Sequence, residues 1–367
     1  MLPFSVILQV LTNYIILCRI NQVFYIFTKI KLKSRVFRVK IVNRKQKKGT
    51  ILIMYWFISA AVILTLAALG LTTAYICFLK IFYSSRKKPK VEEEYPTPEG
   101  DIYDPHREQM IQWIKEVRAM PHTDVSVTSF DGLLLRGKYF EYKKGAPIEI
   151  LFHGYKGTAE RDMCGGVYRC FEIGHSALIV DHRASGHSEG KVITFGVLES
   201  RDCLKWVELV MNRIDKDAKI ILTGISMGAA TVMTAASLEL PPNVIGILAD
   251  CGYTSTKEII KKVMRDMKLP ADLMYPFARL GAMLFGKFDP DSESPIKSMK
   301  KCSLPVIFFH GDVDDFVPCY MSEENYAACT SEHKRLVITK GAGHGLCFPV
   351  DMDTYFAELN AFFAPHV

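Results

Sequence analysis

Two serines in this sequence lie in the pattern Gly-x-Ser-x-Gly, which at a sharp turn presents a serine hydroxyl to an ester or amide carbonyl. The first is Ser188, in "GHSEG" at residues 186–190, and the second is Ser226, in "GISMG" at residues 224–228. A single catalytic domain uses one such nucleophile, so at most one of the motifs is catalytic. The chemistry requires a buried strand leading into the turn and a helix leading out of it, so the flanking segments decide between them.

The flanking segments favour Ser226. "KIILT" at 219–223 is typical of a buried strand, and the small residues around Ser226 predict a tight turn into a helix over 227–238. The positive end of that helix would point at the reaction site. Before Ser188, "ALIVD" ends several residues upstream, and "KVITFG" after it is not a helix start. We therefore predict that Ser226 is the nucleophile and that Ser188 is a structural loop residue.

A serine hydroxyl at neutral pH needs a general base, and that base needs an orienting carboxylate. His344, in "GAGHG", follows the last predicted strand and precedes a terminal helix. The loop after the preceding strand offers three acids, Asp312, Asp314 and Asp315. The chain order serine, acid, histidine is one that serine hydrolases use. The sequence therefore predicts His344 as the base and one of these three aspartates as its partner.

The remaining polar residues near these motifs are expected to support the fold. His153 and His310 each end a predicted strand in a His-Gly pair, which favours a role in fixing a turn. The other residues interpreted in this way, as ordinary surface or loop positions or as loop ion pairs, are His175, His182, His187, Asp181 and Arg183.

The negative charge that forms on the carbonyl oxygen during attack needs hydrogen-bond donors. One donor is expected to be the backbone N–H of Met227, the residue after the nucleophile, and the second should come from the loop after the third strand. That loop is "HGYKG", and the N–H of Tyr155 is the donor we predict there.

The elements that would position these residues alternate between strands and helices. The predicted strands are "DVSVTSF", "DGLLLRGKYFEY", "IEILFH", "ALIV", "KIILT", "VIGILAD", "PVIFFH" and "KRLVITK". Beyond the first hairpin this alternation predicts an α/β domain over 120–367 with a doubly wound, mostly parallel sheet. Residues 255–298 are too long for a crossover and contain an apolar, Met-rich helical stretch, so we interpret them as a helical cap.

The N-terminal third has a different character. Residues 54–80 carry a run of apolar residues long enough to cross a bilayer at about 20 residues per span, which predicts a transmembrane helix. Residues 1–53 form a basic and apolar extension, which we interpret either as a second span or as sequence preceding a true start at Met54. A segment over 81–119, basic and then rich in Pro and Glu, predicts an exposed linker that ends in a short helix.

Charge and cysteine content bear on location. The net charge of +7 is concentrated over 29–48 and 80–90, which favours a membrane surface over nucleic acid as the partner. If the chain starts at Met54, the basic flank lies on one side of the span and places the large domain in the cytoplasm. If residues 1–53 are present, both flanks are basic and the orientation stays open. The ten cysteines lack metal-ligand spacing, which favours a reducing compartment and predicts no metal or other cofactor.

From about residue 120 to 365 the chain resembles α/β-hydrolase fold proteins of the serine-hydrolase branch, grouped with serine aminopeptidase-like (S33-type) and carboxylesterase-like domains. The motifs that carry the resemblance are "HGYKG", "DHRASGHSEG", "GISMG", "HGDVDDFVP" and "GAGHG". In that family the acid stands fifth in the motif His-Gly-x-x-Asp-x-x-Val-Pro, so the resemblance implies Asp314 as the acid of the triad.

The resemblance implies a membrane-anchored serine hydrolase that cleaves carboxylic esters or thioesters through an acyl-enzyme intermediate. A serine aminopeptidase-like peptidase is the first alternative, because both would share the residues named so far and differ in the cap and pocket. A non-catalytic membrane-anchored binding protein on the same fold is the second. The expected partners are a small-molecule ester or short peptide and the membrane, with no nucleic acid.

Overall fold

The structure of the chain is a computed structural model that describes residues 44–84 and 95–366. The second span or early start considered within residues 1–53 lies largely outside the described residues, as does the basic segment 85–94. The chain divides into two compact units, Met1–Ala67 and Ala68–Val367. The second unit contains all of the predicted site residues.

One sheet of eight strands organises the second unit, in the order β1-β2-β4-β3-β5-β6-β7-β8. β1 pairs with β2, and β2 with β4, in antiparallel fashion, whereas the pairs from β4 to β8 are parallel. The predicted α/β class with a mostly parallel sheet is therefore confirmed. The strands are β1 (Thr123–Thr128), β2 (Leu134–Phe140), β3 (Ile148–Phe152), β4 (Ser176–Val180), β5 (Ile220–Ile225), β6 (Val244–Asp250), β7 (Val306–Gly311) and β8 (Lys334–Thr339).

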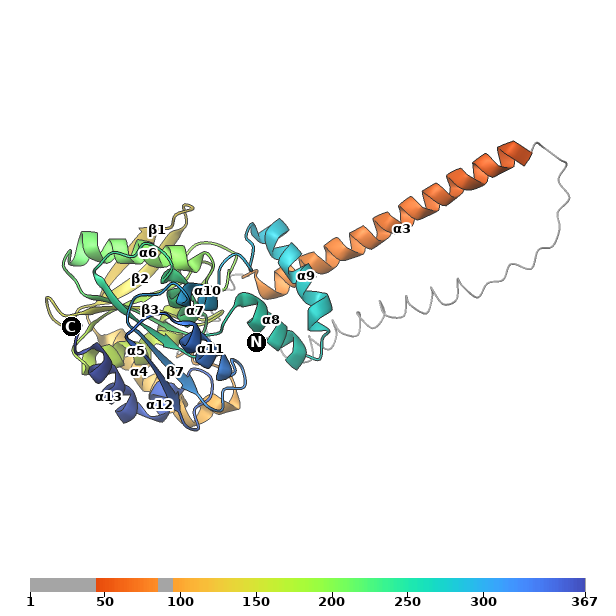
Figure 1. Cartoon of the computed structure of the whole chain (residues 1–367). Helices are drawn as coiled ribbons and strands as arrows, with labels where there is room; N and C mark the ends of the chain where they lie inside the picture. Colours follow the sequence, from red (N-terminus) through yellow and green to blue (C-terminus); the bar gives the residue numbers. More distant parts are fainter. Residues whose placement is uncertain (1–43, 85–94, 367) are drawn as a thin grey trace. The chain divides into compact units, whose positions relative to one another are not determined.

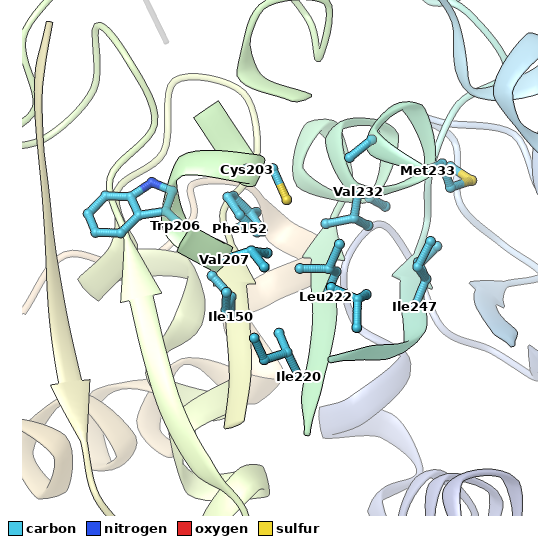
Figure 2. Packing of buried hydrophobic residues seen from close by; sticks show 14 of the residues in the cluster. Ile150, Phe152, Cys203, Trp206, Val207, Ile220, Leu222, Val232, Met233 and Ile247 are labelled. Carbon is cyan, nitrogen blue, oxygen red and sulfur yellow. The ribbon is translucent and has the colours of Figure 1, made fainter. Parts of the chain in front are cut away.

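Helices cover both faces of this sheet, which explains why β3, β4 and β7 are buried at every residue. On one face lie α6 (Glu199–Leu209), α7 (Met227–Ala235), α10 (Pro295–Met299) and α11 (Tyr320–Ala328). Figure 2 shows Trp206 and Val207 of α6 and Val232 of α7 packed against side chains from β3, β5 and β6. On the other face lie α4 (Arg107–Ala119), α5 (Ala159–Glu172), α12 (Cys347–Val350) and α13 (Met352–Phe363).

The predicted insertion between β6 and β7 contains α8 (Thr256–Asp266), α9 (Ala271–Gly281) and the π-helical turn η3 (Ala282–Gly286) (Figure 1). The Ser255 hydroxyl caps α8 by accepting the Glu258 N–H. The buried faces of these helices join a third apolar cluster together with Met227, which follows the predicted nucleophile.

Helix α3 (Arg44–Ile81) contributes its last turns to this third cluster. Within α3, Leu52–Ile81 is long and apolar enough to cross a membrane, with a mean hydropathy of 2.3 over its most apolar window. Phe78 and Phe82, at the end of the helix, are nonetheless buried against the insertion and the sheet domain. The sequence did not predict that the end of the apolar helix would be part of the second unit.

Part of the segment predicted as an exposed linker also packs on the domain. The short helix η1 (Asp101–His106) precedes α4, and the Tyr103 hydroxyl donates a hydrogen bond to the His344 carbonyl at 3.0 Å. Ile102 lies close to Gly343. Residues 95–106 are nonetheless mostly exposed or half-buried, and Tyr103 connects this segment to the last loop of the domain.

Candidate active site

Ser226 stands at the junction of β5 and α7 in a backbone conformation that non-glycine residues rarely adopt. Its φ is 56° and its ψ is −114°. The flanking glycines are required by close packing, because a Cβ at Gly224 would lie 2.2 Å from the backbone of Gly228, and a Cβ at Gly228 would lie 1.9 Å from the Phe152 carbonyl oxygen. Strained turns of this kind concentrate at functional sites, where the surrounding structure holds them in place.

The three residues of the predicted triad lie within hydrogen-bond distance of one another. His344 Nε2 is 2.9 Å from Ser226 Oγ, and His344 Nδ1 is 2.7 Å from Asp314 Oδ2. The other two candidate acids do not reach the histidine. Asp312 accepts the Gly341 N–H at 2.6 Å, and both Asp312 and Asp315 are exposed. The structure therefore brings Ser226, His344 and Asp314 together and leaves the neighbouring aspartates outside.

Asp314 is held as a carboxylate. Burial opposes its ionisation, but hydrogen bonds from His310 and His344 and from the Val317 N–H outweigh that effect and hold the pKa of Asp314 well below its ordinary value. Its second oxygen, Oδ1, accepts the N–H groups of Phe316 at 2.9 Å and Val317 at 2.8 Å. A fixed, ionised carboxylate is what orients a catalytic histidine and stabilises its protonated form.

Two further residues at this site were not assigned to it from sequence. The side chain of His310 is fully buried, with Nε2 lying 3.3 Å from Asp314 Oδ2 and 2.7 Å from the Val317 carbonyl oxygen. Cys251, buried and with a φ of 47°, has its sulfur in a group with Asp314 and His344 whose ligand atoms lie within 4.8 Å of one another. Both nitrogens of His344 are already engaged, so the hydrogen-bonded triad accounts for this cluster.

The two predicted oxyanion donors lie on segments adjacent to Ser226. Met227 is the first residue of α7, where backbone N–H groups have no partner within the helix. Gly154 precedes Tyr155, and a Cβ built on it would lie 3.6 Å from Ser226 Cβ. The loop after β3 therefore runs directly beside the elbow, as an oxyanion loop must.

Solved structures of other proteins share the fold of this chain. The structure of the esterase Pf2001 from Pyrococcus furiosus matches with a TM-score of 0.57 at 21% identity, over 74% of this chain and 97% of that one. The α/β hydrolase GrgF from Penicillium sp. sh18 matches with a TM-score of 0.54 at 19% identity, over 67% of this chain and 99% of that one. The chain has the α/β-hydrolase fold.

Two curated proteins are similar in sequence. The uncharacterised protein YqkD of Bacillus subtilis is 29% identical over 192 residues, which is 52% of this chain and 63% of that protein. Less than two thirds of its length is therefore spanned. Protein bem46 of Schizosaccharomyces pombe is 24% identical over 75% of this chain and 82% of that protein. No family model matches the chain.

Within the α/β-hydrolase fold, His153 fixes the loop that carries Tyr155. Its Nδ1–H donates to the Gly154 carbonyl at 2.7 Å, and its Nε2 accepts the His182 N–H at 3.1 Å. Burial lowers the pKa of His153 to about 4, so the ring is neutral at neutral pH. His182 lies in a loop, as expected, but not at the surface: its side chain is buried, and its ring nitrogen Nε2 lies 3.1 Å from the His153 carbonyl oxygen.

His175 also lies in a loop, as expected, but not at the surface. It is buried and its Nδ1 lies 2.9 Å from Glu149, a fully buried carboxylate that also pairs with Arg169. The sequence hid this cluster because Glu149 lies inside a strand, and its partners come from elements up to 74 residues away. His187, in contrast, is exposed, as the sequence suggested.

The Tyr155 side chain connects the loop after β3 to α3. Its hydroxyl donates to the Ile81 carbonyl at 2.5 Å, and its ring lies 4.8 Å from the ring of Phe195. Beyond Ile81 the chain continues as an extended segment, where the Ile193 N–H donates to the Phe82 carbonyl at 2.8 Å. The last turn of the apolar helix is thus hydrogen-bonded to the loop beside the elbow.

Proposed function

We propose that this protein is a serine hydrolase that cleaves carboxylic esters or thioesters through a Ser226–His344–Asp314 triad. The observation that carries the proposal is the unbroken hydrogen-bond series from Ser226 Oγ through the His344 ring to Asp314, at an elbow with a strained serine backbone. The similar solved structures include an esterase and an α/β hydrolase, which agrees with hydrolysis as the reaction class.

In the proposed reaction, Ser226 Oγ attacks the carbonyl carbon while His344 Nε2 takes the hydroxyl proton. The Met227 and Tyr155 N–H groups stabilise the resulting oxyanion, and Asp314 stabilises the protonated imidazole. The carbon–oxygen or carbon–sulfur bond then breaks, and His344 returns the proton to the departing alcohol or thiol. Water, deprotonated by the same histidine, attacks the acyl-enzyme and releases a carboxylic acid and free Ser226.

The surroundings of the elbow favour an apolar acyl group. Met227 belongs to the same apolar cluster as Phe195, Tyr253 and the buried faces of the cap helices. A binding site that opens among such apolar side chains would favour an ester with an acyl or aromatic portion over a charged peptide terminus. The competing hypothesis is an S33-type aminopeptidase, and the substrate preference of the protein distinguishes it from an esterase or thioesterase.

We also propose that α3 anchors the protein in a membrane as a single span, through Leu52–Ile81, with the hydrolase domain in the cytoplasm. The described cysteines all carry free thiols, and nearly all of them are buried, which suits a reducing compartment. Protease protection in sealed membrane vesicles tests on which side of the membrane the domain lies. A cytoplasmic domain is digested in inside-out vesicles and protected in right-side-out vesicles.

The proposed function is tested with detergent-solubilised full-length protein and two substrate series, p-nitrophenyl esters of increasing acyl length and an aminoacyl-anilide. We expect kcat/KM to rise with acyl length to a maximum and turnover of the anilide to be far slower. Ser226→Ala provides the background for every substrate. Preferred cleavage of the anilide would support the peptidase instead, and absence of turnover of both series would support the binding protein.

A further inference from the structure

The cap and the end of α3 together expose an unusual amount of apolar side chain. Residues 68–81 belong to the same compact unit as the cap, and both present large apolar residues to the outside. We call the following set the anchor–cap surface: Leu69, Leu71, Tyr75, Ile76, Leu79, Leu273, Leu280, Met283, Leu284 and Phe285. Contiguous apolar surfaces of this kind mark a binding site for a protein or a membrane.

The two parts of the anchor–cap surface are held together by close packing. A Cβ at Gly281 of α9 would lie 2.2 Å from the Ala74 carbonyl oxygen, so the two helices meet where only glycine fits. Next to this contact, the rings of Tyr75 and Phe285 lie 4.9 Å apart, edge to face. The apolar face of the cap is therefore continuous with the side of the apolar helix.

The length of the apolar helix leaves room for this role. Leu52–Ile81 comprises 30 residues, whereas the hydrocarbon core of a bilayer requires about 20 residues of helix. Its C-terminal turns bury Ala74, Cys77 and Phe78 on the protein side and expose Tyr75, Ile76 and Leu79 on the other. A segment that is apolar on its outer side and joined to a span is suited to the interface between acyl chains and headgroups.

Positive charge lies beside the apolar face. Between residues 257 and 293 there are seven Lys and Arg residues against six Asp and Glu. In the groove between α8 and α9, Lys261 pairs with Asp272, and Arg279 pairs with Asp289 and Asp291. The exposed basic side chains that remain at the border of the apolar face are Lys257, Arg265, Lys268 and Lys287. An apolar helix face with basic residues at its border is the pattern of a helix lying in the surface of an anionic membrane.

We propose that the anchor–cap surface binds the surface of an anionic phospholipid bilayer, with α9 and η3 at the boundary between headgroups and acyl chains. The basic residues of the cap then contact lipid phosphate and carboxylate groups. This inference rests on the proposed membrane span of α3 but not on the proposed hydrolysis. It predicts that the cap rests on the membrane from which an apolar substrate would be taken.

The test uses full-length protein in phosphatidylcholine vesicles with and without phosphatidylserine, in which the acyl chains carry bromine as a quencher. Met283→Trp introduces a reporter on η3, and Ile338→Trp is the control on β8, with 48% and 40% exposure of the native side chains. We expect the emission of the Met283→Trp reporter to be quenched strongly, as for a side chain about 5–10 Å into the boundary region. We expect the control reporter to add no quenched emission to that of the native tryptophans.

A second variant examines the charges. Phosphatidylserine is expected to increase the quenching of the Met283→Trp reporter. Adding Lys257→Glu and Lys268→Glu should reduce this increase by about fivefold for each basic residue lost at the membrane surface. Circular dichroism confirms that the variants are folded. Equal quenching of the two reporters would overturn the proposal. This result is also expected if a second copy or another protein segment covers position 283, because the reporter would then not contact the acyl chains. Quenching that ignores both phosphatidylserine and the two substitutions would overturn the anionic preference.

Discussion

Ser188 and Ser226 occupy the same five-residue pattern and are both buried, yet their surroundings differ in every respect that matters for catalysis. Ser188 Oγ donates to the Asp181 carbonyl at 2.6 Å and accepts the Arg136 N–H at 2.8 Å, so its hydrogen-bonding capacity serves the loop. Ser226 Oγ contacts the ring of His344, and its backbone is strained. The pattern alone therefore identifies neither residue, and the partner of the hydroxyl distinguishes them.

The loop around Ser188 is held by a buried charge network. Arg183 pairs with Asp202 at 2.7 Å and with Asp131 at 2.9 Å, while the Asp181 carboxylate accepts N–H groups from Ala159 and His187 at 2.8 Å each. These contacts agree with the expectation that Asp181 and Arg183 support the fold. Substitutions at the Ser226 turn are therefore expected to lower activity, whereas substitutions in the Ser188 loop are expected to lower stability.

The largest expected effect is the loss of activity when Ser226, in the second motif, is replaced. Ser226→Ala should lower kcat/KM for an ester by at least about a thousandfold, because the triad loses its nucleophile. Thermal unfolding should change little, since the new side chain removes only the hydroxyl. Ester hydrolysis and a melting curve measure both. Retained activity in this variant, together with loss in Ser188→Ala, would reverse the assignment of the two motifs.

The acid provides the next comparison. Asp314→Asn should lower kcat by about a hundredfold or more, because the amide cannot stabilise protonated His344 and favours the wrong tautomer. Asp315→Asn is the matched control, because Asp315 is adjacent in the chain but exposed. Steady-state kinetics on the same ester compare them. Equal losses in the two variants would leave the triad without an assigned acid.

The first motif should respond through stability. Ser188→Ala leaves a buried N–H and a buried carbonyl without their partner, which should cost about 1–3 kcal/mol in the free energy of unfolding. The activity of the folded fraction should stay near that of the wild type. Denaturant unfolding and active-site titration separate the two quantities. A folded variant with normal stability and no activity would contradict the structural role of Ser188.

The smallest effect near neutral pH concerns acid stability beside the first motif. Burial lowers the pKa of His182 from 6.5 to about 3, so the unfolded state binds this proton first as the pH falls. Stability should then decline below pH 6.5, by about 1 kcal/mol per pH unit for this histidine, down to its folded pKa. His182→Gln should flatten this part of the stability curve in urea titrations at several pH values. An unchanged slope would mean that His182 is not buried as a neutral ring.

Much of the site could be predicted because chemistry and secondary structure act locally. The strand before Ser226, the helix after it and the glycines around it are encoded within a few residues, as are the loops of Asp314 and His344. The resemblance selected Asp314 among three neighbouring acids, and the geometry agrees because only its loop position turns the carboxylate toward His344.

Other features depend on contacts between distant segments and left no local signal. Cys251 follows β6 and meets Asp314 and His344, which follow β7 and β8. His310 lies only four residues from Asp314, but its His-Gly context suggested a role in a turn rather than a contact with the acid. The packing of Phe78 and Phe82 on the cap could not be predicted, since a uniformly apolar helix gives no pattern that marks its buried face. The buried Glu149 was likewise hidden, because its charge is compensated by residues from other elements.

The most direct test of the central claim is reaction of the detergent-solubilised protein with a fluorophosphonate, followed by peptide mapping. The account predicts one labelled serine, Ser226, in the peptide that contains "GISMG", with no label in Ser226→Ala and full label in the folded fraction of Ser188→Ala. Label on Ser188, or absence of label on a folded wild-type protein, would contradict the claim that Ser226 is the nucleophile of a serine hydrolase.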